Sequence, residues 1–130
     1  MANTGRPLSP HLQVYKWQVQ MLSSILHRAT GIVLAVGSLI IVWGLAALAA
    51  GEQAFGTFTA CAASPIGMVV MVGWSLAFFY HLANGIRHLL QDTGAGYAVA
   101  SFVRSSWISI IASIVLTVLV WGYVLAGGHA

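Results

Sequence analysis

The residues best suited to chemistry are two histidines at the end of a long apolar stretch. His81 lies near the end of a run, residues 53–86, that contains no Asp, Glu, Lys or Arg, and His88 comes just after it. Seven residues are about two helical turns, or about 10 Å along the axis, so one helix would carry both imidazoles on nearly one face. Ionisable groups in such a run usually face the inside of a bundle and serve a cofactor, ion or substrate. The pair fits a haem, with His81 deep enough for the iron and His88 nearer the surface, where propionates would lie.

A second polar group precedes the first apolar run. Ser24 and Arg28 are four residues apart and therefore share a helical face, and His27 lies beside them. In one interpretation Arg28 reaches the lipid phosphates and His27 stays at the membrane interface. In the other, these residues form a polar pocket that hydrogen-bonds a carbonyl or a carboxylate. The residue types alone favour neither interpretation.

Composition identifies the class of protein that must position these groups. The chain has 130 residues, of which 59% are hydrophobic and 5% are charged, whereas soluble chains average about 25% charged residues. A membrane crossing needs about 20 apolar residues, and three segments meet this requirement, within about residues 23–50, 66–91 and 105–126. We expect the first span to be permanent, because a signal peptide would begin nearer the start of the chain. The sequence thus predicts an all-α integral membrane protein with three transmembrane helices, forming one anchor domain over residues 1–130.

Residues 1–22 are predicted to lie at the membrane interface. Ser9 and Pro10 resemble a helix start, with Ser as the cap and Pro at the first helical position. Beyond them, Trp17 and Met21 recur at helical spacing, and Lys16 lies between apolar positions. Aromatic and basic side chains of this kind suit the headgroup region. We therefore expect a short amphipathic N-terminal helix.

Small residues predict close packing of the spans. A stripe at four-residue intervals in the third span allows another helix to approach closely, and several glycines favour the same. The stripe consists of Ser105, Ser109, Ser113 and Thr117, and the glycines are Gly31, Gly37, Gly44 and Gly73. The single cysteine, Cys61, excludes an internal disulfide and is interpreted as a small packing residue.

The few charges predict the orientation in the membrane. Arg6, Lys16 and Arg28 precede or begin the first span, and Arg87 and Arg104 flank the second loop. The first loop, roughly residues 51–65, has an acidic residue and no Lys or Arg. The positive-inside rule then places the N-terminus and the second loop on the cytoplasmic or matrix side. The C-terminus is expected on the periplasmic or intermembrane side.

Three motifs together carry a family resemblance. They are the opening Arg6–Leu12, the pattern Ser-x-x-His-Arg-x-Thr-Gly at Ser24–Gly31, and the pattern His-x-x-x-Gly-x-Arg-His-x-x-x-Asp at His81–Asp92. In this order they resemble the large membrane anchor subunits of succinate dehydrogenase, the cytochrome b556 family of respiratory complex II. The resemblance covers the whole chain and implies part of a haem-binding helical bundle in a bacterial cytoplasmic or mitochondrial inner membrane.

The resemblance implies roles for the haem residues. His81 corresponds to an axial ligand of haem b, and the second axial histidine would come from the small anchor subunit. His27, Arg28 and His88 correspond to groups near the haem propionates. A low-spin b haem needs two axial ligands, so one chain with a single deep histidine would share its haem across a subunit interface.

The resemblance also implies a quinone site. Ser24 and Arg28 correspond to residues lining the ubiquinone pocket, and Trp17 and Met21 to its wall. The role of Asp92 is left open between an ion pair with Arg87 and a subunit contact. The implied partners are the iron–sulfur, flavoprotein and small anchor subunits, and nucleic acid is not among them. The chain would belong to an enzyme that passes electrons from succinate to ubiquinone, and would itself contain no succinate-oxidising residues.

Two other classes of protein stay open from the sequence. The anchor of a fumarate reductase, or another quinone-linked cytochrome b, would use a similar bundle. A protein without redox chemistry, such as a small transporter subunit or an assembly factor, would purify without a haem absorption band. A reduced-minus-oxidised spectrum therefore separates the redox classes from the last one.

Overall fold

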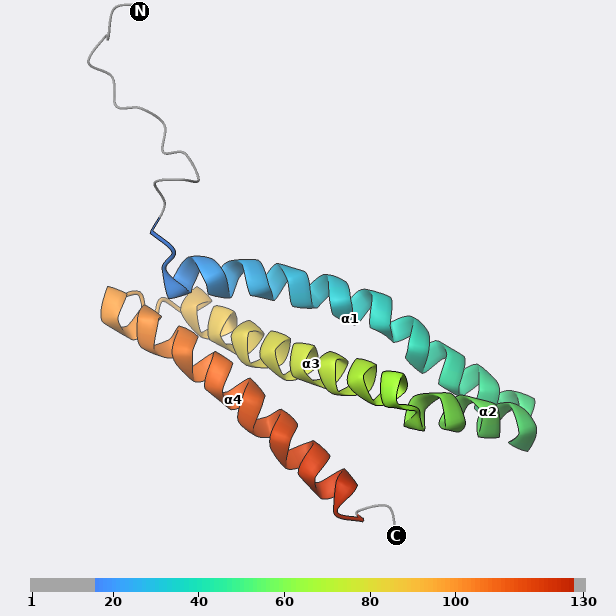
Figure 1. Ribbon diagram of the computed structural model, residues 1–130. Helices are drawn as coiled ribbons and strands as arrows, with labels where there is room; N and C mark the ends of the chain where they lie inside the picture. The colour runs from blue at the N-terminus through green and yellow to red at the C-terminus, as the bar shows by residue number, and fades with distance from the viewer. Residues whose placement is uncertain (1–15, 128–130) are drawn as a thin grey trace, which may run out of the picture.

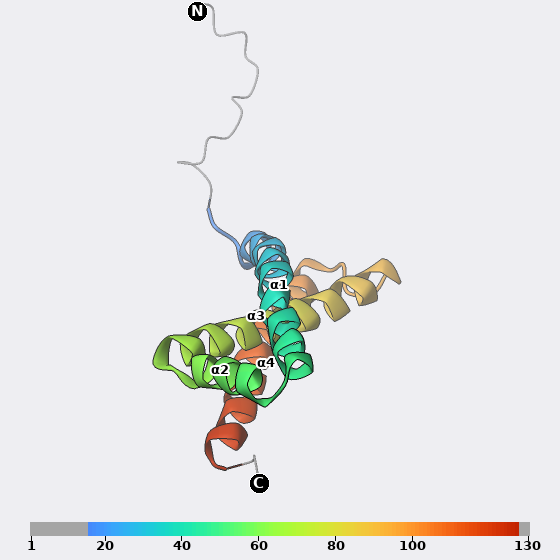
Figure 2. The same ribbon diagram turned by 90° about the vertical axis from the view of Figure 1, so that its right-hand side faces the viewer.

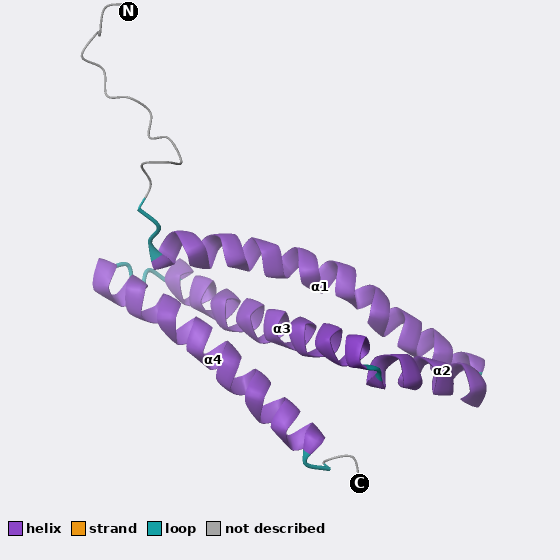
Figure 3. Ribbon diagram, viewed as in Figure 1, coloured by secondary structure: helices purple, strands orange, loops and turns teal. Residues whose placement is uncertain are grey.

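The computed structural model describes residues 16–127, which form four helices and no strand (Figures 1 and 3). The helices are α1 (Val19–Ala50), α2 (Glu52–Ala63), α3 (Pro65–Asp92) and α4 (Val99–Leu125). By length and composition α1, α3 and α4 could each cross a membrane. The prediction of an all-α protein with three spans is confirmed.

Helix α3 occupies the centre of the arrangement. It contacts α1, α2 and α4, and its direction is opposite to that of α1 and α4 (Figure 1). Helix α4 lies beside the end of α3 and diverges from it toward the C-terminus, as the turned view in Figure 2 also indicates. The start of α1, the end of α3 and the start of α4 therefore meet at one end of the bundle, and α2 lies at the other.

Helix α2 was not predicted, because its residues were expected to form a loop. The chain turns at Gly51, whose φ of 112° suits a glycine. Glu52 lies in the first turn of α2, where an acidic side chain interacts favourably with the helix dipole. The helix packs onto α1 through Phe58, whose ring meets Trp43 edge-on with centroids 5.0 Å apart. Because all but two of its 12 residues are small or polar, α2 gave no clear periodic signal in the sequence.

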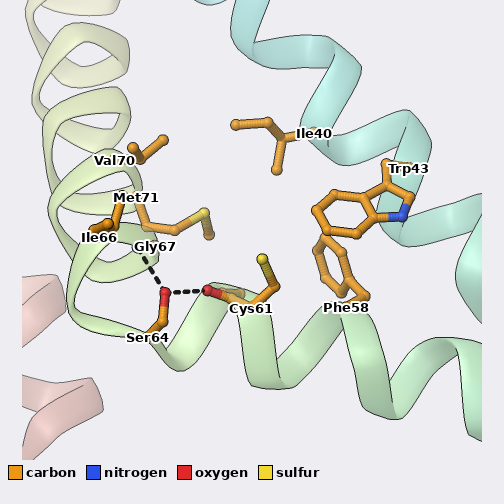
Figure 4. Close-up of a pocket in the computed structure, with 10 residues that line it drawn as sticks. Ile40, Trp43, Phe58, Cys61, Ser64, Ile66, Gly67, Val70 and Met71 are labelled. Atoms are coloured by element: carbon orange, nitrogen blue, oxygen red, sulfur yellow. Dashed lines mark hydrogen bonds between the residues drawn. The ribbon is translucent and has the colours of Figure 1, made fainter.

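A serine cap defines the start of α3. The backbone N–H of Gly67 donates to Ser64 Oγ over 3.1 Å, and Pro65 occupies the first helical position (Figure 4). The Ser64 hydroxyl in turn donates to the carbonyl of Cys61 over 2.6 Å. Cys61 is free and exposed, and it lines a mostly apolar cavity of about 320 Å³ between α1, α2 and α3. These bonds set the sharp change of direction between α2 and α3.

The outside of the bundle is apolar and its inside is mainly polar. Large hydrophobic side chains are exposed on every span, for example Ile32, Leu39 and Val118. Among the described residues only three hydrophobic side chains are buried, compared with eight polar or charged ones. This inverts the usual distribution of a soluble protein and is expected where lipid covers the outer face.

The predicted stripe of small polar residues faces the other helices. Ser109, Ser113 and Thr117 are buried, and Ser106 is fully buried beside them. Ser105 is half-buried and bonds a side chain of α3. The hydroxyls of the stripe also donate to carbonyls of their own helix, so they cost little when buried. The prediction of a helix-packing stripe is confirmed.

The glycine prediction is confirmed at three positions, and at the fourth no close contact is formed among the described residues. A Cβ at Gly37 would collide with the indole of Trp74, and one at Gly44 would lie 2.8 Å from the ring of Phe58. At Gly31 a Cβ would lie 3.1 Å from the ring of His81. Gly73 has no neighbour within 4 Å of the corresponding point, so no close packing requires it.

The N-terminal segment is described only from residue 16. Residues 16–18 are not helical, and α1 begins at Val19. Trp17 therefore precedes the helix and is 65% exposed, whereas Met21 lies in the first turn and is half-buried. An amphipathic helix does not continue through residues 16–18, and its predicted start at Ser9 and Pro10 lies outside the described residues.

The arrangement of the spans predicts the membrane topology. Arg28, Arg87 and Arg104 all belong to the end of the bundle where α1 begins. We expect a reporter inserted near Gly96 to be cytoplasmic and one fused after Ala130 to be periplasmic, because Lys and Arg are retained on the cytoplasmic side. Paired phosphatase and fluorescent-protein fusions measure this directly. The reverse pattern would show that the bundle is inverted.

Candidate functional site

Three histidines converge between α1 and α3. The rings of His27 and His81 are stacked, with centroids 4.0 Å apart and planes 10° from parallel. His88 lies next to His27, with centroids 5.2 Å apart. The two motifs that carry them, on separate helices, thus form one site.

The hydrogen bonds of His81 leave one ring nitrogen available. Its Nδ1 lies 3.1 Å from the backbone carbonyl oxygen of His27. Nδ1 also lies 3.2 Å from Thr30 Oγ1, whose hydroxyl donates to the Leu26 carbonyl and can therefore accept. Because a carbonyl oxygen only accepts, these contacts favour the tautomer with the proton on Nδ1, which leaves the Nε2 lone pair free. No described residue hydrogen-bonds to Nε2. Metal-binding histidines usually hold their other N–H in this way, and Gly31 provides the room for the ring at this position.

The hydrogen bonds of His88 differ from those of His81. The side-chain amide nitrogen of Asn84 lies 3.3 Å from His88 Nε2. The carbonyl oxygen of Asn84 accepts bonds from Ser23 and Arg87, which identifies the other atom as the NH₂ donor. Nε2 of His88 therefore accepts a hydrogen bond within the chain. His81 is the better placed of the two to offer Nε2 to a metal.

His27 has unused hydrogen-bonding capacity. Its backbone carbonyl accepts from His81, but its ring nitrogen Nδ1 is buried and has no hydrogen-bond partner within the part of the chain that the structure describes. Buried polar atoms of this kind are uncommon and call for a partner. A bound group with polar substituents beside His27 would supply one.

A buried polar cluster lies beside the histidines, and we call Ser23, Tyr80, Asn84 and Arg87 the Arg87 cluster. Ser23 Oγ donates to Asn84 Oδ1 over 2.9 Å, and the Tyr80 hydroxyl donates to the Ser23 carbonyl over 3.0 Å. Arg87 Nη1 donates to Asn84 Oδ1 over 2.6 Å and to Ser23 Oγ over 3.2 Å. The cluster joins α1 to α3.

The guanidinium of Arg87 also reaches α4. Its Nε donates to Ser105 Oγ over 3.1 Å, and its carbon atom Cζ lies 4.5 Å from the ring centre of Phe102, a cation–π contact. Arg87 is only 6% exposed. Asp92 is exposed, and in the described part of the chain the guanidinium bonds neutral partners. Of the two roles left open for Asp92, an ion pair with Arg87 is not formed.

The residues expected near a quinone lie on the outer side of α1. Ser24, Arg28 and Trp17 are exposed. Met21, in the first turn of α1, is half-buried. No hydrogen bond joins these side chains to the Arg87 cluster in the described residues. The structure thus separates them from the histidine face, although His27 and Arg28 are neighbours in sequence.

Sequence reasoning missed the Arg87 cluster. Ser23 and Asn84 are fully buried, yet the sequence pattern singled out Ser24 in place of Ser23. A usable signal was present, because an amide and a guanidinium three residues apart in an apolar run are expected to bond each other and face the bundle interior. The partner on α1, Ser23, could not be identified from the sequence, because only the rotation of α1 about its axis shows which serine faces Arg87.

Comparison with known proteins gives the family. The sequence pattern described as "Succinate dehydrogenase/Fumarate reductase transmembrane subunit" matches residues 2–120. The chain belongs to this family. Its relatives include the succinate dehydrogenase cytochrome b556 subunit of Rickettsia felis, which is 40% identical over 116 residues, 89% of this chain and 90% of the relative. The corresponding subunit of Paracoccus denitrificans is 40% identical over 115 residues, 88% of each chain.

A mitochondrial relative extends the comparison. The succinate dehydrogenase cytochrome b560 subunit of Mus musculus is 37% identical over 121 residues, 90% of this chain and 68% of the relative. The resemblance inferred from the three sequence motifs is confirmed. The family comprises transmembrane subunits, in agreement with the three apolar spans.

The Arg87 cluster predicts different roles in stability for two adjacent serines. Ser23→Ala removes a hydroxyl that bonds Asn84 and Arg87, and should lower the free energy of unfolding by about 1 kcal/mol. Ser24→Ala changes an exposed side chain and should leave the free energy of unfolding unchanged. Thermal unfolding of the two purified variants measures the difference. Equal unfolding temperatures would contradict the structural role of the cluster.

Proposed function

We propose that this chain is the large membrane anchor of a succinate dehydrogenase, where it binds haem b together with a small anchor subunit and forms part of the site of ubiquinone reduction. The observation that carries the proposal is His81, with Nδ1 bonded to a backbone carbonyl and Nε2 free. The names of the relatives support succinate dehydrogenase, and the family description includes fumarate reductase as the alternative.

The residues of the histidine site fit a haem that is completed by another subunit. His81 would supply one axial imidazole, and within residues 16–127 no three His, Cys, Asp or Glu side chains are arranged so that they could hold a metal ion together. The second axial ligand would come from the small anchor subunit, because a low-spin b haem needs two. When bound, haem b supplies a one-electron carrier inside the bilayer. His27 and His88 would bind the propionates, and the unpaired Nδ1 of His27 supports this role. Arg28 was also expected there, but it lies in the outer, exposed row of α1 and is proposed only for the quinone.

The outer face of α1 fits the quinone site. Ser24 and Arg28 are exposed near the start of α1, where the iron–sulfur subunit would cover them. The Ser24 hydroxyl would donate to one quinone oxygen, and the Arg28 guanidinium would stabilise negative charge that develops on reduction. Trp17 and Met21 would form the wall. The protons would come from the cytoplasmic or matrix side.

The proposal divides the enzyme's work among its subunits. The flavoprotein and iron–sulfur subunits would oxidise succinate, and this chain would contribute no group to that reaction. It would hold those subunits at the bacterial cytoplasmic or mitochondrial inner membrane, with its N-terminus on their side. Its own residues would bind and orient haem and quinone and exclude water from them.

The first test of the proposal concerns the iron ligand. His81→Leu should abolish or convert the low-spin b spectrum, because it removes the free Nε2. His88→Leu should retain the spectrum and shift mainly the redox potential, because its Nε2 already accepts from Asn84. Reduced-minus-oxidised spectra and redox titrations of the purified complexes measure both effects. A low-spin signal that survives His81→Leu and disappears in His88→Leu would overturn the assignment.

The second test concerns the quinone pocket. Ser24→Ala and Arg28→Leu should each reduce the succinate–quinone rate by about tenfold to a hundredfold, the order expected for loss of a hydrogen-bond donor or charge that stabilises the reacting oxygen. Succinate-driven reduction of a soluble dye should persist, since the other subunits perform it. Thr57→Ala, on exposed α2, is the matched control. Unchanged quinone kinetics in both variants would contradict the pocket.

A further inference from the structure

A second cavity, with mainly apolar walls and a few polar groups, lies between α3 and α4, away from the histidines. Its volume is about 500 Å³, and its walls include Arg87, Gln91, Ser101 and Ser105. On α3 the apolar part of the wall comes from Ala83, Ile86 and Leu90. At about 100° per residue these positions lie roughly opposite His81 around the helix. The cavity is therefore separate from the histidine site.

The positive charge at this cavity has no acidic partner within the chain. The sequence contains two acidic residues. Glu52 lies on α2 at the other end of the bundle, and Asp92 is exposed and does not bond Arg87. Arg87 nevertheless is 6% exposed and donates to neutral oxygens through Nε and Nη1. Because a buried charge is costly unless an opposite charge compensates it, an anion at this position would stabilise the site.

Gln91 provides a second, independent indication of a ligand. It lines the same cavity one turn beyond Arg87 and is 7% exposed, yet its amide nitrogen Nε2 has no hydrogen-bond partner in the described residues. The unused amide donor of Gln91 thus lies one helical turn from an uncompensated guanidinium, and Ser101 lines the same cavity. Guanidinium, amide and hydroxyl donors together recognise phosphate oxygens.

The position and the walls of the cavity indicate whether the phosphate belongs to a lipid headgroup or is a free ion. Arg87 and Gln91 belong to the last two turns of α3, so they lie at the end of a span, at the depth of lipid headgroups. Away from these donors the cavity is apolar, lined by Ile86, Leu90 and Ile108. A free phosphate ion would use the donors and leave these walls without a partner, whereas a phospholipid would use both.

We propose that the α3–α4 cavity is a binding site for an anionic phospholipid. The headgroup phosphate would accept from the Arg87 guanidinium and the Gln91 amide, and an acyl chain would lie against Ile86, Leu90 and Ile108. Basic pockets between transmembrane helices at this depth commonly bind anionic lipids. The site does not depend on haem or quinone, so it can be tested whether or not those proposals hold.

The test uses the protein purified from membranes with the subunits that accompany it, after delipidation in detergent. Native mass spectrometry would count bound dioleoyl phosphatidylglycerol, dioleoyl phosphatidylcholine or inorganic phosphate. Gln91→Glu and Ser101→Glu place a carboxylate in the cavity, and Gln53→Glu places the same charge on exposed α2. We expect the first two variants to weaken phosphatidylglycerol binding about fivefold or more and Gln53→Glu to leave it unchanged, because one charge contributes about 1 kcal/mol.

The outcomes separate the alternatives. Binding of phosphatidylglycerol that exceeds that of phosphatidylcholine and is lost in both cavity variants supports the proposal. Ser101 is exposed, so Ser101→Glu tests it even if Gln91→Glu fails to fold. Equal binding of phosphatidylglycerol by all variants would overturn the proposal. The Arg87 guanidinium would then be expected to pair with an acidic group of another subunit. Inorganic phosphate that binds as tightly as the lipid, with the same dependence on the variants, would overturn the lipid assignment.

Discussion

The buried guanidinium of Arg87 is the constraint on which the rest of the site depends. A positive charge buried between membrane-spanning helices is stable only if its donors are bonded. Three helices meet this requirement, through Ser23 on α1, Asn84 on α3 itself and Ser105 on α4. The bonds to Ser23 and Ser105 fix how far α1 and α4 are rotated relative to α3. The cost of leaving the charge unbonded thus selects one packing of the three spans.

This rotation sets which residues of α1 face the bundle and which face outward. Ser23 faces Arg87, and His27, one turn later, stacks on His81. Ser24 and Arg28 form the neighbouring row and are exposed. One helix therefore presents an inner row to the histidine site and an outer row to other subunits. If haem and quinone bind as proposed, adjacent residues of α1 would contact the two of them, which keeps the distance for electron transfer short.

The sequence predicted the features that depend on a single helix. Span number, the shared face of His81 and His88, and the buried stripe at Ser109 and Ser113 all follow from helical spacing and hydropathy. Features that depend on two helices were missed or wrong. Ser23 was overlooked because Ser24 has the same chemistry, and only the rotation of α1 distinguishes them. Arg87 was expected to flank the second loop, on the side where the positive-inside rule places basic residues. Its burial requires Asn84, Ser105 and Phe102 at the same point, and two of these come from another helix.

The composition of the bundle interior explains why the packing of the helices depends on polar contacts. In lipid, apolar side chains gain little by leaving the outer face, so helices associate through close packing and hydrogen bonds. This chain follows that rule, since its buried residues are mainly serines, Thr117 and the Arg87 cluster. Polar atoms left without partners are therefore informative, because the bundle has no large apolar core to compensate for them. Nδ1 of His27 and Nε2 of Gln91 are two such atoms, the first beside the histidines and the second at the α3–α4 cavity. Their positions indicate two separate faces at which groups outside the chain complete its hydrogen bonding, one beside the histidines and one between α3 and α4.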